Sequence, residues 1–315
     1  MASHPTSSTR PSIGGQAVLE GVMMRGPASW SVACRKPDLS IAVARHELPG
    51  WTTRRPWLKW PLLRGCVVLA ESLAIGMKAL MISANHAMDE DEQLSDKQLT
   101  VTLISATVLF SAIFIVLPVF IAKLIDAASG DLSHNRPVIF SVIEGLVRLA
   151  MFLGYLFLIG QFKDVRRVFQ YHGAEHKTIY AYENGDALDP ADIDRKYPTL
   201  HVRCGTNFLF IVLFLTIIAH FLIDLVAPAS LLPRIGIRIL AIPILAGFSY
   251  EVIKLASRNE SSFFFKATMW PGLLLQKITT KPPSLDQIEV AIAAMQAVAP
   301  DESTAIDEVP DAPVS

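Results

Sequence analysis

Four long apolar segments constrain this chain more than any other feature of its sequence. Residues 101–122 carry no charged side chain over 22 positions, and a helix of about 20 apolar residues crosses the ~30 Å hydrocarbon core of a bilayer. Three further segments of similar character follow, at residues 138–162, 208–226 and 235–255. Apolar residues make up 51% of the chain and charged residues only 18%. We therefore expect an α-helical integral membrane protein with about four transmembrane helices.

The sequence ahead of these helices predicts a small β-structure. Three short runs of apolar and polar residues, 16–25, 30–35 and 39–45, are separated by turn signals at 26–27 and 36–38. Short alternating runs divided by Gly, Pro and Asp are typical of antiparallel strands. We expect a small antiparallel β-meander on the cytoplasmic side of the membrane.

Two other apolar segments are too polar or too aromatic to read as simple spans. Residues 62–88 are interrupted by Arg, Glu, Lys and His side chains, and residues 263–278 contain a lysine and a Trp-Pro pair. We expect both to form interfacial or re-entrant helices. Residues 284–298 predict an amphipathic helix that begins with a capping box of Ser284 and Gln287.

On this interpretation the chain divides into eight segments. The first four are a disordered N-terminus, the β-meander with an interfacial segment, an interfacial or re-entrant helix with its linker, and transmembrane helices 1 and 2: residues 1–13, 14–60, 61–98 and 99–162. The other four are a cytoplasmic loop, transmembrane helices 3 and 4, an interfacial segment with the amphipathic helix, and a disordered acidic tail: residues 163–205, 206–256, 257–299 and 300–315.

The distribution of Lys and Arg predicts the orientation of the chain in the membrane. Of 28 such residues, eleven precede the first span, seven lie between the second and third, and four follow the fourth. Because cytoplasmic loops are enriched in Lys and Arg, we expect both termini and the central loop on the cytoplasmic side of the membrane. The lipid bilayer is the expected partner, other membrane proteins are further candidates, and a net charge of −1 offers no attraction to nucleic acid.

The central loop contains the motif His-x-x-Glu-His. His172 and His176 are four residues apart and project from one face of a predicted helix, a spacing that lets two imidazoles bind one divalent metal ion such as zinc. Glu175 lies beside them, where it could hold a water molecule and take its proton. Two solvated histidines on a polar helix are the alternative. A second pair, His201 and Cys204, follows before the third span, and polar clusters between membrane segments are usually functional.

The candidate ligands outnumber what one metal ion needs. Cys204 or His201 would be the third ligand, and Glu20 and Glu251 are carboxylate alternatives. Catalytic zinc sites keep three protein ligands and one open position, whereas four protein ligands form a closed, structural site. For Glu20 the alternative is a solvent-facing position within a strand, and for Glu251 it is an ion pair with Lys254.

Six sequence blocks link the chain to a known family: residues 14–23, 64–72, 169–177, 203–206, 250–252 and 271–273. The block Gln-Tyr-His-Gly-Ala-Glu-His-Lys at 170–177 is the most specific of them. Through these blocks the chain resembles the YqhQ family of bacterial integral membrane proteins over roughly residues 14–298. The family is of unknown function and is described as a predicted metal-dependent enzyme, so the resemblance implies a multi-pass membrane protein with a metal site.

Our leading hypothesis is a membrane-embedded, zinc-dependent hydrolase with its site at the cytoplasmic face. Glu175 would be the general base, and Lys177 or Arg203 could stabilise a developing oxyanion. The alternative is a non-enzymatic scaffold or assembly factor with a structural metal, in which the C-terminal amphipathic helix docks a partner. A third interpretation is transport, which would use polar residues inside the spans: Glu144, Arg148, His220 and Asp224.

Overall fold

The computed structural model describes residues 10–11, 13–48, 50, 58, 60, 62–88, 95–130, 137–226, 231–256 and 262–299. The expected acidic tail at 300–315 and most of the expected disordered N-terminus lie outside these residues. The strands are β1 (Gly14–Val18), β2 (Gly21–Arg25), β3 (Ser29–Arg35) and β4 (Ile41–Glu47). The helices are α2 (Leu63–Ala87), α3 (Asp96–Ala128), α5 (Pro137–Ile159), α6 (Lys163–Glu183), α7 (Pro190–Lys196), α8 (Gly205–Val226), α9 (Leu231–Ala256), α10 (Phe263–Thr279) and α11 (Leu285–Val298).

The strands form one antiparallel sheet in the order β1-β2-β3-β4, which confirms the predicted meander. The predicted first run, 16–25, is two strands rather than one, because a two-residue turn at Leu19 and Glu20 separates β1 from β2. Glu20 adopts a φ of 50° there, a conformation that non-glycine residues rarely take. The expectation that Glu20 lies in the middle of a strand was therefore wrong.

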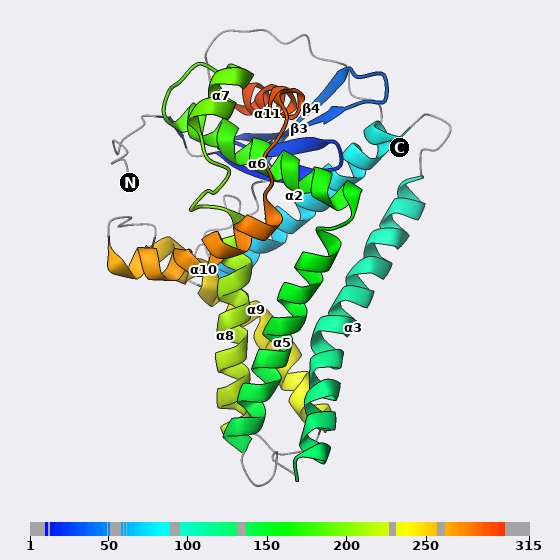
Figure 1. Ribbon diagram of the computed structural model, residues 1–315, viewed down its shortest axis with the longest axis vertical. Helices are drawn as coiled ribbons and strands as arrows, with labels where there is room; N and C mark the ends of the chain where they lie inside the picture. Colours follow the sequence, from blue (N-terminus) through cyan, green and yellow to red (C-terminus); the bar gives the residue numbers. More distant parts are fainter. Residues whose placement is uncertain are drawn as a thin grey trace.

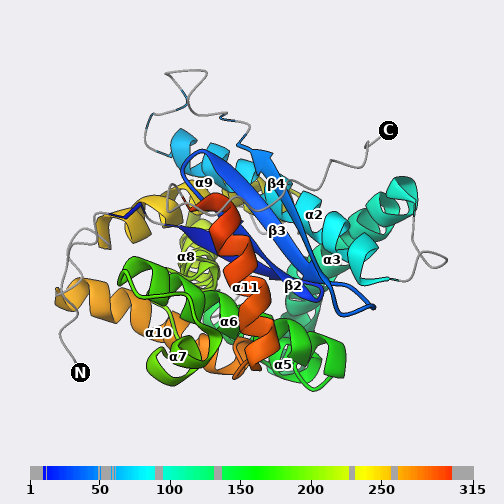
Figure 2. The same cartoon turned by 90° about the horizontal axis from the view of Figure 1, so that it is seen from above.

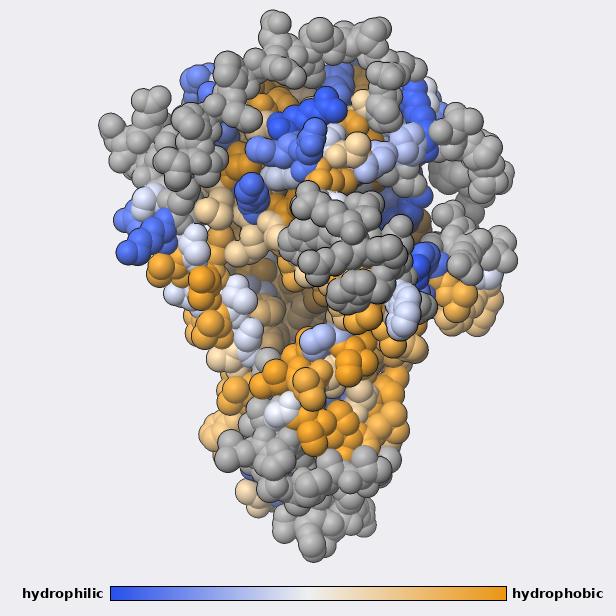
Figure 3. All heavy atoms as spheres, turned by 180° about the vertical axis from the view of Figure 1, so that it is seen from behind, coloured by the Kyte–Doolittle hydropathy of each residue, from blue (hydrophilic) through white to orange (hydrophobic). Residues whose placement is uncertain are grey.

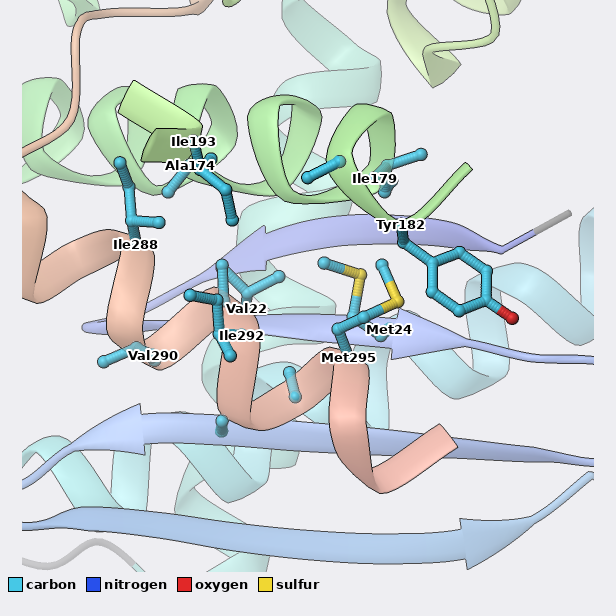
Figure 4. Packing of buried hydrophobic residues seen from close by; sticks show 14 of the residues in the cluster. Val22, Met24, Ala174, Ile179, Tyr182, Ile193, Ile288, Val290, Ile292 and Met295 are labelled. Carbon is cyan, nitrogen blue, oxygen red and sulfur yellow. The ribbon is translucent and has the colours of Figure 1, made fainter. Parts of the chain in front are cut away.

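Both faces of the sheet are covered. In β2, Val22 and Met24 belong to the core shared with α6 and α11, whereas Met23 belongs to the core shared with α2. Successive side chains of a strand point to opposite faces, so a strand buried on both sides needs apolar residues at consecutive positions. Figure 4 shows Met24 and Val22 beneath Met295 and Ile292 of α11.

Helix α11 confirms the predicted amphipathic helix and its capping box, in which the Ser284 N–H donates to Oε1 of Gln287 at 3.0 Å. Ile288 and Met295 are fully buried against the sheet and α6, while Leu285 is exposed. Seen from above, α11 lies across β2 and β3 beside α6 (Figure 2). The apolar face that the scaffold hypothesis reserved for a partner is thus occupied by the protein's own sheet.

Four helices run together along the long axis of the molecule, on one side of the sheet (Figure 1). They are α3, α5, α8 and α9, they coincide with the four predicted spans, and α3 with α5, α5 with α8, and α8 with α9 pack in pairs. Their outward faces carry exposed apolar side chains, and Figure 3 shows this surface as predominantly apolar below a more polar end.

Helix α2 raises the number of candidate spans, because five described helices, α2 among them, are long and apolar enough to cross a membrane. The sequence interpretation excluded α2 for its polar side chains. In the structure it connects the bundle to the sheet: a Cβ on Gly65 would lie 2.8 Å from the carbonyl oxygen of Gly247 in α9, and Ile75 and Ala79 pack under the sheet. Glu71 is buried in an ion pair with Arg25 at 2.6 Å, so its charge is compensated within the fold.

Candidate metal centre

Helix α6 carries the His-x-x-Glu-His motif into the interior of the protein. It packs against β1 and α11, and Glu175 and His176 are 4% and 1% exposed. The rings of His172 and His176 lie side by side, with centroids 4.4 Å apart. The alternative of two solvated histidines therefore does not describe this helix. Helix α6 ends at Glu183, and its C-cap residue Asn184 is followed by Gly185 with a φ of +74°.

A backbone carbonyl fixes each imidazole. Nδ1 of His172 donates to the carbonyl oxygen of Thr279 at 2.9 Å, and Nδ1 of His176 donates to that of Thr199 at 2.5 Å. Donation from Nδ1 leaves the lone pair on Nε2 free, which is the usual arrangement of metal-ligating histidines. Nε2 of His172 lies 3.1 Å from Sγ of Cys204, so the free nitrogen faces the thiol.

Cys204 immediately precedes α8 and completes the cluster. The backbone N–H and the hydroxyl of Thr206 donate to its Sγ at 3.4 and 3.2 Å. Burial raises the pKa of the Cys204 thiol, but the neighbouring His176 and Thr206 outweigh burial and hold the pKa below its usual value. A thiol that ionises readily is suited to metal binding, because the thiolate is the form that binds.

The cluster fits a divalent metal ion. One ligand atom from each of His172, His176 and Cys204 lies within 4.8 Å of the others, and two imidazoles with one thiolate form a donor set typical of zinc. Nε2 of His176 is buried without a hydrogen-bond partner among the described residues. Leaving a buried polar atom unpaired is costly, and a bound metal ion would satisfy it.

The carboxyl of Glu175 lies against β1. A Cβ on Gly15 would lie 2.7 Å from its Oε1, so only glycine leaves room for this carboxyl. Oε2 is buried and has no hydrogen-bond partner among the described residues. Burial raises the pKa of Glu175 to about 8, with His172 opposing and Cys204 adding to the shift. A carboxyl with a pKa close to neutral is suited to accepting and returning a proton.

A cavity of about 260 Å³ opens beside the cluster. It lies between the residues leading into β1, helix α6 and the start of α8, and Glu175, His176 and Cys204 line it. Gly14 and Gly205 form parts of its wall, and a Cβ on either would meet nothing within 4 Å. A small molecule in this cavity would therefore lie beside His176, Cys204 and Glu175.

His201, the fourth predicted ligand, lies outside the group of three. It is 3% exposed, and its ring packs on those of His176 and Tyr180, with centroids 5.5 and 4.4 Å away. The side chain of Gln276 binds both the backbone N–H and the carbonyl oxygen of His201, each at 2.8 Å. Three grouped ligands leave one coordination position open, which is the arrangement of a catalytic rather than a structural zinc site.

Neither carboxylate alternative joins the cluster. Glu20 forms a bidentate ion pair with Arg167 of α6, because the β1–β2 turn places it over that helix. Glu251 accepts two hydrogen bonds from Arg64 at 2.7 and 2.6 Å, so α9 is tied to α2 rather than to the histidines. The sequence suggested Lys254 as the partner of Glu251 and did not predict this contact with Arg64, which links α2 to α9.

A family model described as "Protein of unknown function (DUF1385)" matches residues 60–301. The chain belongs to this family. It is 36% identical over 305 residues to the "Uncharacterized protein YqhQ" of Bacillus subtilis (strain 168), an alignment that covers 90% of each chain. The resemblance drawn from the sequence blocks is thereby confirmed. No solved structure matches the chain.

In this DUF1385 protein, the residues that orient the site were not predicted. Thr199 and Thr279 act through their carbonyl oxygens, which every residue possesses, so no residue type signals them. Gln276 gave a weak signal as a polar residue in an apolar helix, and it proves to be fully buried. Gly15 belongs to the Gly-Gly pair that begins β1, and close backbone approach is one of the reasons a strand carries glycine.

We expect Gly173→Ala to destabilise this family member, because α6 approaches the chain after α10 at this position. A Cβ there would lie 2.2 Å from the carbonyl oxygen of Lys281, and moving backbone to relieve such a clash costs about 1–3 kcal/mol. Thermal unfolding of detergent-solubilised protein measures the effect. Gly154→Ala in α5 is the matched control, since a Cβ there meets nothing within 4 Å. Equal melting temperatures for the two variants would contradict the close approach.

Proposed function

We propose that the protein is a metal-dependent hydrolase, embedded by α3, α5, α8 and α9 in the bacterial cytoplasmic membrane with both termini and the metal centre on the cytoplasmic side. The orientation is supported by the Lys and Arg distribution of the sequence. Figure 1 supports it further, because the candidate site lies at the end of the bundle that carries the sheet. Helix α10, with exposed Phe263, Phe264 and Trp270, would lie along the membrane surface.

The observation that carries the proposal is the pair of anchored imidazoles facing a thiol. His172 and His176 each donate Nδ1–H to a carbonyl oxygen, Nε2 of His172 lies 3.1 Å from Sγ of Cys204, and one ligand atom of each of the three residues lies within 4.8 Å of the others. A zinc ion held there would act as a Lewis acid and lower the pKa of a water molecule that it binds. The three protein ligands would leave one position for that water.

Glu175 would transfer the proton of the attacking water molecule. Its carboxyl lines the same cavity as His176 and Cys204, and its free Oε2 can accept a hydrogen bond from a water molecule between them. In hydrolysis it would take a proton from the attacking water and return it to the leaving group. The burial around it excludes bulk water, which would otherwise exchange with that proton.

We expect Glu175→Gln to abolish hydrolysis without loss of metal. The test uses zinc-loaded protein in detergent with a panel of fluorogenic carboxylic esters, acyl amides and phosphate esters. Loss of a positioned general base lowers turnover about 10²–10⁴-fold, whereas zinc content should equal that of the wild type. Glu20→Gln is the matched control, because Glu20 pairs with Arg167 outside the cluster. No turnover of any probe by the wild type would favour the scaffold alternative instead, and equal turnover by Glu175→Gln would contradict the role of Glu175 as general base.

A further inference from the structure

His201 lines the cavity, and its Nε2 atom has no hydrogen-bond partner in the part of the chain that the structure describes. The side chain of Gln276 forms hydrogen bonds with both backbone groups of His201. The ring of His201 is buried, and the residue lines the cavity together with Glu175 and Cys204. Nδ1 of His201 accepts a hydrogen bond from the backbone N–H of Arg203 at 3.2 Å. A neutral imidazole that accepts at Nδ1 carries its hydrogen on Nε2. The Nε2–H group is therefore the one available for binding.

Nε2 of His201 has no hydrogen-bond partner among the described residues. The nearest carboxylate oxygen, Oε2 of Glu183, lies 3.8 Å away, which is beyond hydrogen-bonding distance. A buried donor without an acceptor costs free energy. Because this donor borders a cavity beside the candidate ligands, an oxygen atom of a bound molecule would satisfy it.

The cationic side chains near the site are already engaged. Nζ of Lys177 donates to the carbonyl oxygen of Asp194 at 2.7 Å and pairs with the Asp194 carboxylate at 2.9 Å. Arg203, the one cation among the described residues that line the cavity, forms an ion pair with Glu183. A cavity without an unpaired cation suits an uncharged carbonyl group better than a phosphate dianion.

We propose that the Nε2–H of His201 binds the carbonyl oxygen of an acyl substrate, an ester or amide, and stabilises the negative charge that develops on it. The proposal rests on the hydrolase function above and assigns His201 the role that the sequence suggested for Lys177 or Arg203. The two hydrogen bonds from Gln276 and the ring contacts with His176 and Tyr180 hold the imidazole of His201 in place before substrate binds. Such preorganised donors contribute more than mobile ones.

The bond changes are those of simple hydrolysis. The water oxygen bonds to the carbonyl carbon while its proton passes to Glu175, and the carbonyl electron pair moves onto the oxygen beside His201. When that pair returns, the bond from the carbonyl carbon to the leaving group breaks. The leaving oxygen or nitrogen takes the proton from Glu175, so one water is consumed and an acid and an alcohol or amine are released.

The test is the binding of acetohydroxamate, a carbonyl-bearing ligand of metal ions, to cobalt-loaded protein. Cobalt(II) replaces zinc, and its visible absorption reports both metal binding and ligand binding. His201→Asn retains an acceptor for the Arg203 N–H but loses the donor at the Nε2 position, whereas His201→Gln places an amide N–H near that position. Inorganic phosphate is titrated in parallel.

We expect acetohydroxamate to bind His201→Asn about tenfold more weakly than wild type, the scale of one hydrogen bond to a charged acceptor, and His201→Gln to recover most of the affinity. Equal affinities in wild type and His201→Asn, a loss of cobalt from His201→Asn, or a preference for phosphate over acetohydroxamate would overturn the role of His201 alone. A wild type that binds no cobalt would overturn the metal centre itself, and with it the proposed hydrolase.

Discussion

Protein purified in detergent and supplied with zinc will retain about one zinc ion per chain, as a single site of three ligands requires, and the double variant His172→Ala/His176→Ala will retain none. The two imidazoles supply two of the three grouped ligand atoms. The thiolate of Cys204 that remains cannot hold zinc at micromolar concentrations. Plasma mass spectrometry of dialysed protein measures the metal content directly.

The control for this experiment is His86→Ala, which removes a half-buried histidine of α2 from outside the cluster. It should retain zinc as the wild type does. The zinc content of Cys204→Ser should lie between that of His86→Ala and that of the double variant, because both anchored imidazoles remain. Wild-type protein without metal after zinc has been added would contradict the metal centre, and equal retention by the double variant would place the ion elsewhere.

Replacing Glu144 by Gln will lower the free energy of unfolding by about 3–5 kcal/mol, the cost of removing one partner from a buried ion pair. Glu144 is 3% exposed at its side chain and lies in a polar network that involves three helices. It accepts a hydrogen bond from Arg148 of α5 at 2.7 Å and two from Arg238 of α9 at 2.6 and 3.0 Å. Nδ1 of His220 in α8 lies 3.3 Å from Arg148. The glutamine variant leaves buried arginines facing a neutral amide.

The matched control is Glu251→Gln, which changes a second bidentate Arg–Glu contact between helices. Glu251 and its partner Arg64 are each 25% exposed at their side chains, so water can solvate the remaining charge, and pairs nearer the surface contribute about 1 kcal/mol or less. Thermal unfolding in one detergent compares the two variants. A melting temperature for Glu144→Gln equal to that of Glu251→Gln would show that burial does not set the strength of these pairs.

The buried network of Glu144, Arg148 and Arg238 bears on the transport interpretation. Glu144 and Arg148, four residues apart in α5, form an ion pair, and Arg238 of α9 pairs with the same carboxylate. Two arginines hold Glu144 through three hydrogen bonds, an arrangement that favours bundle packing over exchange of a proton or ion. The side chain of Asp224 lies outside the described residues. We therefore expect Glu144 to act in stability rather than in transport.

Local sequence patterns predicted much of the fold. Long, predominantly apolar stretches predicted α3, α5, α8 and α9, and the Ser284–Gln287 pair predicted the start of α11. The β1–β2 turn was missed because Leu19-Glu20 lacks the Asn-Gly or Asp-Gly signal of tight hairpins. Helix α7 was missed although Asp189 and Pro190 mark its start, with Asp189 accepting from two backbone N–H groups.

The candidate site was predictable only in part, for a physical reason. Helical spacing brought His172 and His176 together within one element, and Cys204 follows close enough in sequence to be suspected. The roles of His201 and Gln276 depend on contacts 75 residues apart in the chain, which no local pattern encodes. Glu20 and Glu251 were candidates by residue type alone, and long-range ion pairs with Arg167 and Arg64 decided their positions.

The order in which the chain is synthesised affects when the candidate metal centre can form, because the carbonyl oxygen of Thr279 holds the ring of His172. His172 leaves the ribosome 107 residues before the group that holds its ring, and all of α8, α9 and α10 is made in between. Until that last stretch docks, the imidazole rotates freely and the cluster is incomplete. A nascent or truncated chain without α10 would thus have two histidines and a thiol but no formed centre, so metal uptake would report that α10 has been made and has docked.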